Sequence, residues 1–414
     1  MTIELSTIRS LIGIVSLSMI IHGWFFYPLF LLVACRFRRL RGAFPVRLGQ
    51  KSSYNPQILG NLHPGAGSGG EVAAEARCVG ANAAAPVSLA VIIPLVDEVD
   101  CLKACLEALD LQTPRPDQVV VVTDSKLHPA GLGEALECTS LNVCSILVGE
   151  RRGKTAAQNL AMSHIVTDIA VFTDVSSRMQ FGALEHLVTA LADPRIGAAS
   201  GKLVYDSDGS ESQYWRLETW LRSRESTIRG CLGASGALYA IRTCDYIELD
   251  PFVIADLVEP LLIDLRFGRQ TVYVHEARVC EAPPLSENSL LAIKARIHLR
   301  VLASSSWWLP VLDPVRNPAL AFMFFSHKII RWFLWLWLVM LMCAVPPSWS
   351  IIFLGTAILL SLAPARGSFA SLPGRAVRYI ILLVMAQVVG TWRFLLGRPA
   401  AAWTPSFSSP KGSE

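Results

Sequence analysis

The feature that most constrains the fold of this chain is an uncharged apolar segment near its N-terminus. Residues 10–35 contain no Asp, Glu, Lys or Arg. A helix of about 20 residues crosses the hydrocarbon of a bilayer, so this segment is long enough to span one with some tilt. A basic cluster follows at Arg36, Arg38, Arg39 and Arg41. Because basic clusters stay in the cytoplasm, we expect a membrane helix whose N-terminus lies outside.

A cleavable signal peptide is the alternative for such a segment. It would have a short apolar core followed by a small-residue cleavage site. Here the run is long and contains the aromatic residues Trp24, Phe25, Phe26 and Tyr27. This pattern favours a retained membrane helix.

A second apolar region fills the C-terminal part of the chain. Lys328 and Arg331 interrupt it, so we expect residues 319–325 to lie along the membrane interface. Residues 332–345 and 351–363 are predicted to form two short spans joined by a Pro-Pro turn.

A third apolar run, residues 379–391, is short for a membrane span. A tilted helix and a re-entrant helix both fit it. The arginines before it, Arg366, Arg375 and Arg378, should hold the preceding loop in the cytoplasm. We therefore expect a multi-pass protein of the cell membrane, with the number of C-terminal crossings open.

Composition supports a membrane protein with a soluble middle. Only 17% of the residues are charged, whereas soluble domains carry roughly a quarter, and the shortage lies at the two ends. The net charge of +4 is too small to indicate a nucleic-acid partner. The ten cysteines form no CxxC pair, which favours reduced thiols in a cytoplasmic domain.

These observations divide the chain into consecutive regions. Residues rich in Gly, Ala and Ser after the basic cluster are typical of a flexible linker. The predicted regions are a membrane helix with its basic flank at 1–41, that linker at 42–87, a cytoplasmic α/β domain at 88–283, an amphipathic interface region at 284–318, membrane helices at 319–398 and a polar tail at 399–414.

The central region alternates between strand and helix patterns. Strands are predicted at 88–93, 118–123, 142–148 and 168–173, and helices at 99–111 and 155–165. Such alternation predicts a mostly parallel sheet covered on both faces. Ligands bind outside the C-terminal ends of such strands. Pro94, Asp124 and Asp174 should all lie at that edge.

Two of these strand-end residues, Asp124 and Asp174, carry carboxylates. Each carboxylate could have either a ligand-binding role or a structural role. Asp174 could provide an oxygen ligand for Mg²⁺ or Mn²⁺, or it could cap the following turn. Asp124 could accept hydrogen bonds from the N–H groups of a base, or it too could cap a turn. Spacing does not separate these alternatives.

Three further segments have functional and structural interpretations. Residues 149–159 are basic and open a helix, which suits a phosphate or a solvated surface, but they lack the spacing of a Walker loop. Residues 233–242 are rich in small side chains, which suits close approach to a ligand or a plain tight turn. Asp256 precedes a predicted helix and is either its N-cap or a general base.

Taken in order, these segments resemble the family 2 glycosyltransferases with a GT-A fold. The resemblance covers about residues 88–300. It is closest to the membrane-integrated branch that includes hyaluronan and cellulose synthases and related N-acetylglucosamine polymerases. It implies an α/β catalytic domain with a Rossmann-like, mostly parallel sheet and flanking transmembrane helices.

The resemblance also implies roles for the predicted site residues. Asp124 matches the carboxylate that contacts the base, commonly uracil, and Asp256 matches the base that activates the acceptor hydroxyl. Asp174 matches the first Asp of the D-x-D motif, which holds a divalent cation, Mg²⁺ or Mn²⁺. The remaining donor-binding matches are Pro94, Asp97, Glu98, Lys154 and Asn159, and the matches lining the acceptor and sugar pocket are Ser235, Gly236, Ala237 and Arg242.

The sequence departs from the family pattern at several motif positions. Ser176 replaces the last Asp of D-x-D, which makes it a weak metal ligand, and Ala255 replaces the acid before Asp256. The Q-x-x-R-W motif of processive synthases is missing. Near its place stand Arg296 and Arg300, which are expected to contact the diphosphate.

The resemblance implies an inverting glycosyltransferase that uses a nucleotide-sugar donor, with a UDP-sugar expected. The acceptor would be a growing polysaccharide or a lipid-linked molecule at the bilayer, and membrane or export subunits are expected partners. The departures at Ser176 and Ala255 favour an alternative, a non-catalytic membrane subunit or sensor that retains the fold.

Overall fold

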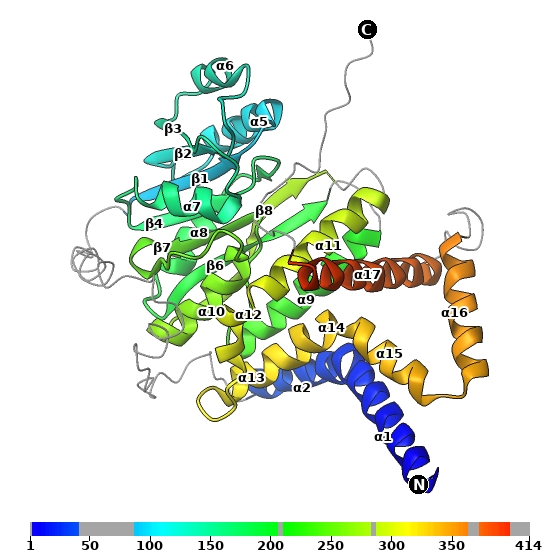
Figure 1. Cartoon of the computed structure of the whole chain (residues 1–414). Coiled ribbons are helices and arrows are strands. Elements are labelled where there is room, and N and C mark those ends of the chain that lie inside the picture. The colour runs from blue at the N-terminus through cyan, green and yellow to red at the C-terminus, as the bar shows by residue number, and fades with distance from the viewer. Residues whose placement is uncertain (1, 41–86, 206–209, 283–286, 363–371, 398–414) are drawn as a thin grey trace.

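The structure is a computed structural model that describes residues 2–40, 87–205, 210–282, 287–362 and 372–397. The predicted linker and C-terminal tail lie outside these residues, apart from residue 87. A single eight-stranded sheet organises the middle of the chain, in the order β3-β2-β1-β4-β7-β6-β8-β5 (Figure 1). Its strands are β1 Leu89–Leu95, β2 Gln118–Thr123, β3 Val143–Leu147, β4 Ile169–Thr173, β5 Arg178–Met179, β6 Ile196–Tyr205, β7 Leu238–Arg242 and β8 Gln270–Glu281.

Four of the predicted strands are confirmed and pair in parallel around β1. β1 pairs with β2 and with β4, and β2 pairs with β3. All seven residues of β1 are buried, which explains its continuous apolar sequence, since a central parallel strand is covered on both faces. The second half of the sheet is mixed, because β7 runs antiparallel to both β4 and β6, whereas β8 runs parallel to β6.

Helices cover both faces of the sheet. One core contains side chains of α5 (Val99–Asp110) and α8 (Ala183–Leu191), and the other contains those of α7 (Lys154–Met162) and α10 (Ala255–Phe267). The predicted helices at 99–111 and 155–165 are thus confirmed. A short helix, α6 (Leu132–Glu137), lies between β2 and β3. Burying one Leu or Ile side chain stabilises a fold by roughly 1.5–3 kcal/mol, so these two layers dominate the stability of the domain.

A third core joins the α/β domain to the apolar ends of the chain. It combines side chains of α2 (Tyr27–Leu40), α9 (Ser210–Ile228), α10, α12 (Ser305–Trp308) and α13 (Pro318–Phe324). Residues 319–325, predicted to lie along the interface, therefore pack partly within the protein, where Leu320 and Phe324 are buried. Figure 1 shows α1 (Thr2–Ile21) and α2 beneath the domain beside α13 and α14 (Ile330–Trp332).

Two helical stretches of the described residues are long and apolar enough to cross a membrane. They are Ser6–Arg38, which covers most of α1 and α2 and the π-helical turn His22–Phe26 between them, and Val377–Leu395 within α17 (Leu372–Leu395). A third is possible only if Pro318–Trp332 and α15 (Leu334–Ala344), which bend by 68° at their junction, form one broken span. The first stretch agrees with the predicted N-terminal membrane helix.

The C-terminal helices differ from the two short spans predicted at 332–345 and 351–363. The first becomes the short helix α15 after a break at Phe333, and α16 (Pro347–Leu362) has only 16 residues. The third apolar run is part of the longer α17, which lies along α11 (Glu287–Ala303) (Figure 1). Gly390 allows this approach, because a Cβ there would lie 2.7 Å from the Ala295 carbonyl oxygen.

Candidate active site

The candidate site forms where β1, β2 and β4 end. Asp124 follows β2 and Asp174 follows β4. Thr173, the last residue of β4, pairs with Leu238, the first residue of β7. The loop before β7 therefore meets the carboxyl ends of the parallel strands, and the N-termini of α7 and α10 complete the same edge.

Asp124 organises the loop before α7. It is 2% exposed, and its two carboxylate oxygens accept the backbone N–H groups of Arg152 at 2.7 Å and Gly153 at 2.9 Å. Gly153 has a φ of +99°, a left-handed value that glycine adopts readily and L side chains do not. Asp124 thus caps a turn that belongs to a distant segment.

Pro94, Asp97 and Glu98 lie next to this loop at the end of β1. Arg151 forms an exposed ion pair with Asp97 at 2.9 Å. Pro94 is buried within β1. Burial raises the pKa of the Glu98 carboxyl. The two acids expected near the nucleoside are thus adjacent to the Asp124 loop.

Lys154 connects the two halves of the site. Lys154 is the first residue of α7. Its ammonium group contacts the Asp174 carboxylate at 2.5 Å and donates to the Gly236 carbonyl oxygen at 3.0 Å. Burial alone would lower its pKa, but Asp174 and Asp256 outweigh burial and raise it. The side chain is therefore held as a cation between two acids, where phosphate oxygens would also be attracted.

Gly236 allows Asp256 to reach this centre. A Cβ at Gly236 would lie 3.2 Å from Asp256 Oδ2 and 3.4 Å from the Lys154 Nζ. The loop is fixed by the Ala234 N–H, which donates to the Asp256 carbonyl oxygen at 2.7 Å, and by the Ser235 N–H, which donates to Ser200 Oγ at 2.9 Å. A side chain at Gly236 would intrude between acid and lysine.

Two arginines of α11 approach from the opposite side. Arg300 donates to the carbonyl oxygens of Phe252 at 3.2 Å and Val253 at 2.6 Å, so it braces the loop before Asp256. Burial lowers its pKa to about 10. Burial also lowers the pKa of Arg296, an effect that Asp174 opposes. The α11 helix therefore brings positive charge to both acids.

The structure adds two carboxyl groups that no sequence motif indicated. Glu281, at the end of β8, accepts a hydrogen bond from Ser177, and burial and Asp174 raise its pKa to about 7. Glu259, one turn into α10 from Asp256, accepts the Tyr239 hydroxyl at 2.9 Å. Neither lies in a recognisable motif, because each is brought to the site only by the fold.

Two predicted residues are bound elsewhere. Arg242 lies at the far end of β7, where it pairs with Ile169 at the start of β4 and donates to the carbonyl oxygens of Leu191, Asp193 and Ile196. The structure thus does not bring Arg242 to the pocket with Ser235, Gly236 and Ala237, because β7 carries it to the opposite edge of the sheet.

Asn159 is the second residue of this kind. Its amide donates to the Leu249 carbonyl oxygen at 2.7 Å and accepts the Tyr246 hydroxyl at 2.5 Å. Its side chain therefore ties α7 to the loop before α10. Both sides of the amide are used in this tie, one turn away from Lys154.

The predicted cation at Asp174 and Ser176 would have few protein ligands. No group of three or more His, Cys, Asp or Glu side chains that could hold an ion occurs among the residues the structure describes. Asp174 and Ser176 follow β4, and Asp174 is bonded to Lys154. Mg²⁺ commonly uses one or two carboxylates together with substrate phosphates. The residues fit a cation that shares its ligands with a diphosphate.

Solved structures identify the fold. A mannosyltransferase from Pyrobaculum calidifontis, in complex with GDP-Man and Mn²⁺, matches with a TM-score of 0.59 and 18% identity, over 94% of this chain and 100% of that chain. A glucosyl-3-phosphoglycerate synthase from Mycobacterium tuberculosis matches with a TM-score of only 0.38 and 15% identity, over 56% of this chain and 82% of that chain. The first likeness shows the GT-A fold.

The fold is thus that of the GT-A glycosyltransferases. Residues 90–247 match the model of the family described as glycosyl transferase family 2. The chain therefore contains a glycosyltransferase domain that is similar to those of family 2. No curated protein matches the chain.

Proposed function

We propose that the enzyme transfers a sugar, with inversion, from a nucleotide-sugar donor to a hydroxyl group of an acceptor held at the membrane. A UDP-sugar is the expected donor, and a growing polysaccharide or a lipid-linked molecule is the acceptor. The observation that carries the proposal is the convergence of Asp174, Lys154 and Asp256 around Gly236. A cation and a second carboxylate beside one small-residue loop support a site for a diphosphate and an acceptor hydroxyl.

The donor would extend from Asp124 to Lys154. The Asp124 carboxylate would accept N–H groups of the base, and the Lys154 ammonium would bind the diphosphate. Arg296 would add positive charge near Asp174, and Arg300 would hold the Asp256 loop. Charge-assisted hydrogen bonds of this kind contribute about 1.5–3 kcal/mol each.

A divalent cation, Mg²⁺ or Mn²⁺, would be held by Asp174 with weak help from Ser176. When bound, it supplies charge neutralisation on the leaving diphosphate. The structurally similar mannosyltransferase from Pyrobaculum calidifontis was solved with Mn²⁺, which supports testing that ion first. Lys154 would have to share Asp174 with it, and the phosphate oxygens offer the lysine its alternative partner.

Asp256 would act as the general base. Its carboxylate takes the proton of the acceptor hydroxyl while the acceptor oxygen forms a bond to the anomeric carbon. The bond from that carbon to the diphosphate oxygen breaks from the opposite face, and its electron pair leaves with the nucleoside diphosphate. Lys154 stabilises the charge that develops there. Base catalysis is typically worth about 10²–10⁴-fold in rate.

The apolar helices would bring the acceptor to this site. They are consistent with a catalytic domain on the cytoplasmic side of the cell membrane, beside helices from both ends of the chain. The proposal includes kinship with the hyaluronan and cellulose synthases and association with export subunits. It leaves two modes of action, processive synthesis and single transfer to a lipid. Product length separates these two modes.

The test is Asp256→Asn in the full-length protein, assayed for transfer from a panel of UDP-sugars and GDP-mannose with Mn²⁺ or Mg²⁺. We expect kcat to fall about 10²–10⁴-fold with donor binding retained. Glu248→Gln, which removes an exposed carboxyl from the loop before α10, is the matched control and should retain full activity.

Two results would contradict the proposal. Unchanged kcat in Asp256→Asn would remove that residue from the role of base. Failure of the wild-type protein to bind or turn over any donor would favour the non-catalytic alternative.

A further inference from the structure

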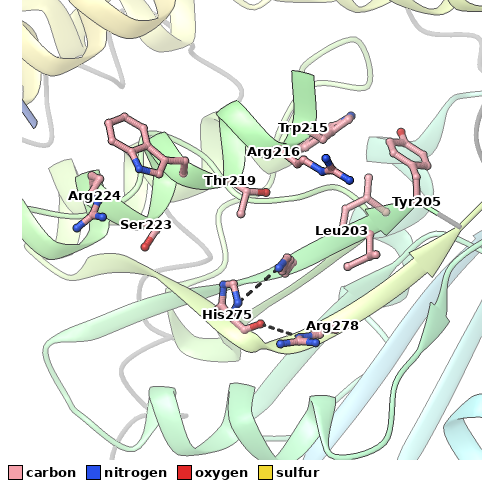
Figure 2. Close-up of a pocket in the computed structure, with 12 residues that line it drawn as sticks. Leu203, Tyr205, Trp215, Arg216, Thr219, Ser223, Arg224, His275 and Arg278 are labelled. Atoms are coloured by element: carbon pink, nitrogen blue, oxygen red, sulfur yellow. Dashed lines mark hydrogen bonds between the residues drawn. The ribbon is translucent and has the colours of Figure 1, made fainter. Parts of the chain in front are cut away.

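A cavity of about 450 Å³ lies between α9 and the paired strands β6 and β8, outside the candidate active site (Figure 2). In Figure 2, Thr219 and Ser223 of α9 lie across from His275 and Arg278 of β8. None of the predicted donor or acceptor residues lines it. The lining residues are Lys202, Leu203, Val204, Tyr205, Trp215, Arg216, Thr219, Trp220, Ser223, Arg224, His275 and Arg278.

The floor of this cavity concentrates positive charge. Lys202 and Arg278 are register partners on β6 and β8, and the Lys202 Nζ lies 3.4 Å from His275 Nε2. No acidic residue occurs among the described residues that line the cavity. The cavity thus carries two cationic side chains on neighbouring strands with no acid among the described lining residues to balance them, and an anion would be attracted to it.

The titration behaviour agrees with that geometry. Burial and the nearby Arg278 lower the pKa of Lys202. Burial, Lys202 and Arg278 likewise lower the pKa of His275, which the adjacent Glu276 opposes only in part. The surroundings of the cavity thus disfavour the charged forms of Lys202 and His275, and a bound anion would offset that effect.

The wall formed by α9 offers neutral donors and aromatic surface. Thr219 and Ser223 lie four residues apart on one helix face, so both hydroxyls point to the same side. Trp220 carries the Arg224 guanidinium at 5.6 Å from its ring centre. Cations, hydroxyl donors and aromatic rings together suit a phosphate ester attached to an apolar group.

The cavity also lies near the basic end of the first membrane helix. The Cys35 thiol donates to the Arg224 carbonyl oxygen at 3.6 Å, and Arg38 donates to the Thr227 carbonyl oxygen at 2.7 Å. Arg38 closes the stretch Ser6–Arg38 that is long enough to span a membrane. If that stretch spans a membrane, this end of α9 lies at the level where lipid headgroups meet water.

We propose that this cavity binds a phosphate group carried by a membrane lipid, with Lys202 and Arg278 as its principal ligands. Thr219 and Ser223 complete the hydrogen bonding from the α9 side. Because the cavity shares no residue with the donor site, the proposal stands whether or not the proposed donor chemistry is correct. The same chemistry would accept a soluble phosphate, and the experiment distinguishes the two sources.

The experiment measures binding of dioctanoyl phosphatidic acid, below its micelle concentration, to the full-length protein in a neutral maltoside detergent by isothermal titration calorimetry. We expect saturable binding at one site, weakened about tenfold or more by Lys202→Met and by Arg278→Met separately. Lys103→Met, which removes an exposed lysine from α5, should bind like the wild type. Dioctanoylglycerol, which lacks the phosphate, should not bind.

Each outcome decides a part of the proposal. Inorganic phosphate that binds as tightly as the lipid would overturn the lipid source. Binding unaffected by either substitution, or equal binding of the neutral lipid, would overturn the site. Thermal unfolding of each variant shows that it is folded, and the exposed position of Arg278 makes Arg278→Met the variant that retains a wild-type midpoint.

Discussion

A single buried carboxylate, Asp124, sets the shape of the loop that leads into α7. Both of its oxygens accept backbone N–H groups. The following lysine can reach Asp174 only because that loop is fixed. The cap and ligand interpretations of Asp124, which the sequence left open, are therefore compatible, since one carboxylate has enough lone pairs for both.

Asp124→Asn tests this double role. The amide nitrogen would face a backbone N–H group, so one hydrogen bond is lost and a donor meets a donor. We expect UDP to bind about 10- to 100-fold more weakly, from the loss of about 1.5–3 kcal/mol, as measured by isothermal titration calorimetry. Asp117→Asn is the control, because Asp117 accepts the Leu89 N–H at 2.8 Å at the other end of the sheet. Equal UDP affinity in both variants would contradict the role.

Glu259 is a buried acid with an incomplete set of partners. Its Oε2 accepts the Tyr239 hydroxyl at 2.9 Å, whereas its Oε1 has no hydrogen-bond partner among the described residues. Burial, opposed by Tyr239 and assisted by Asp256, raises its pKa from 4.5 to about 8. The folded protein therefore holds this side chain protonated at neutral pH.

The raised pKa of Glu259 predicts a pH-dependent stability. Its contribution is fully present below pH 4.5 and is lost as the pH rises to about 8, because the unfolded chain ionises first. The loss is at most about 1.4 kcal/mol per pH unit. Glu259→Gln should remove this fall, so its thermal midpoint should gain on the wild type between pH 5 and pH 8. A constant difference between the two proteins across that range would contradict the assignment.

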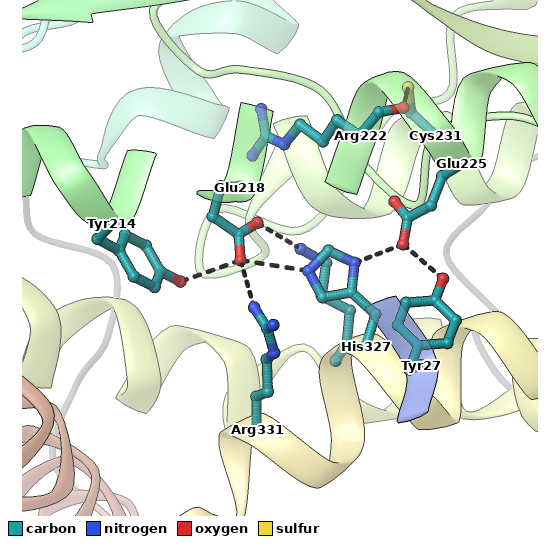
Figure 3. Close-up of polar contacts among 9 residues, drawn as sticks. Tyr27, Tyr214, Glu218, Arg222, Glu225, Cys231, His327 and Arg331 are labelled. Carbon is teal, nitrogen blue, oxygen red and sulfur yellow. Dashed lines mark hydrogen bonds and ion pairs between the residues drawn. The ribbon is translucent and has the colours of Figure 1, made fainter. Parts of the chain in front are cut away.

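Among the elements, α9 is tied to α2 and to the helical segment Phe325–Trp332 by buried charges rather than by apolar packing alone (Figure 3). Glu218 accepts hydrogen bonds from His327 at 3.2 Å, Lys328 at 3.4 Å and Arg331 at 3.1 Å. About two turns further along α9, Glu225 contacts Tyr27 and the other side of the same imidazole.

This network accounts for the charges within the second apolar region. Lys328 and Arg331 interrupt that region in the sequence, and in the structure they pair with Glu218 inside the protein, where Arg331 is 7% exposed. Hydropathy counts each charge alone and therefore does not register such pairs. The strands β1 to β4 were predictable because their buried faces are continuously apolar. The α9 helix was not, because its buried face carries charge.

Glu218→Gln tests the tie. Burial alone would raise the pKa of Glu218, but Lys328, His327 and Arg331 hold it well below the usual value of 4.5. The variant leaves buried cations without their counter-charge, and we expect a loss of about 3–5 kcal/mol in stability. Thermal unfolding in detergent measures it, with the exposed Glu134→Gln as control.

The pH dependence separates a lost charge from a packing defect. Because the Glu218 pKa is lowered, its contribution is present above pH 4.5 and is lost as the pH falls further. The difference between wild type and Glu218→Gln should therefore shrink in acid. A difference that stays constant below that pH would point to packing.

For the whole molecule, sequence order predicted the centre of the site better than its surroundings. Asp124, Lys154, Asp174, Gly236 and Asp256 do gather at one edge of the sheet, because strand ends and helix starts leave local patterns. Glu281 and the basic cavity leave none, since strands and helices far apart in the chain bring them into place. Glu259 lies one turn from Asp256 in α10, but no motif marks its burial against Tyr239. Arg242 shows the reverse, a motif residue that the strand direction carries away.

The tie between Tyr27, Glu225 and His327 has a consequence for biosynthesis. Glu225 leaves the ribosome 198 residues after Tyr27, and His327 follows 102 residues later. At about 5–20 residues per second, the first helix waits on the order of 15–60 s for its last partner. For the last third of that interval, about 5–20 s at the same rate, the nascent chain exposes two glutamates and an unpaired helix face, because Glu225 has been made but His327 has not. Any premature termination before α14 would release a product that quality control can recognise by those unmatched charges.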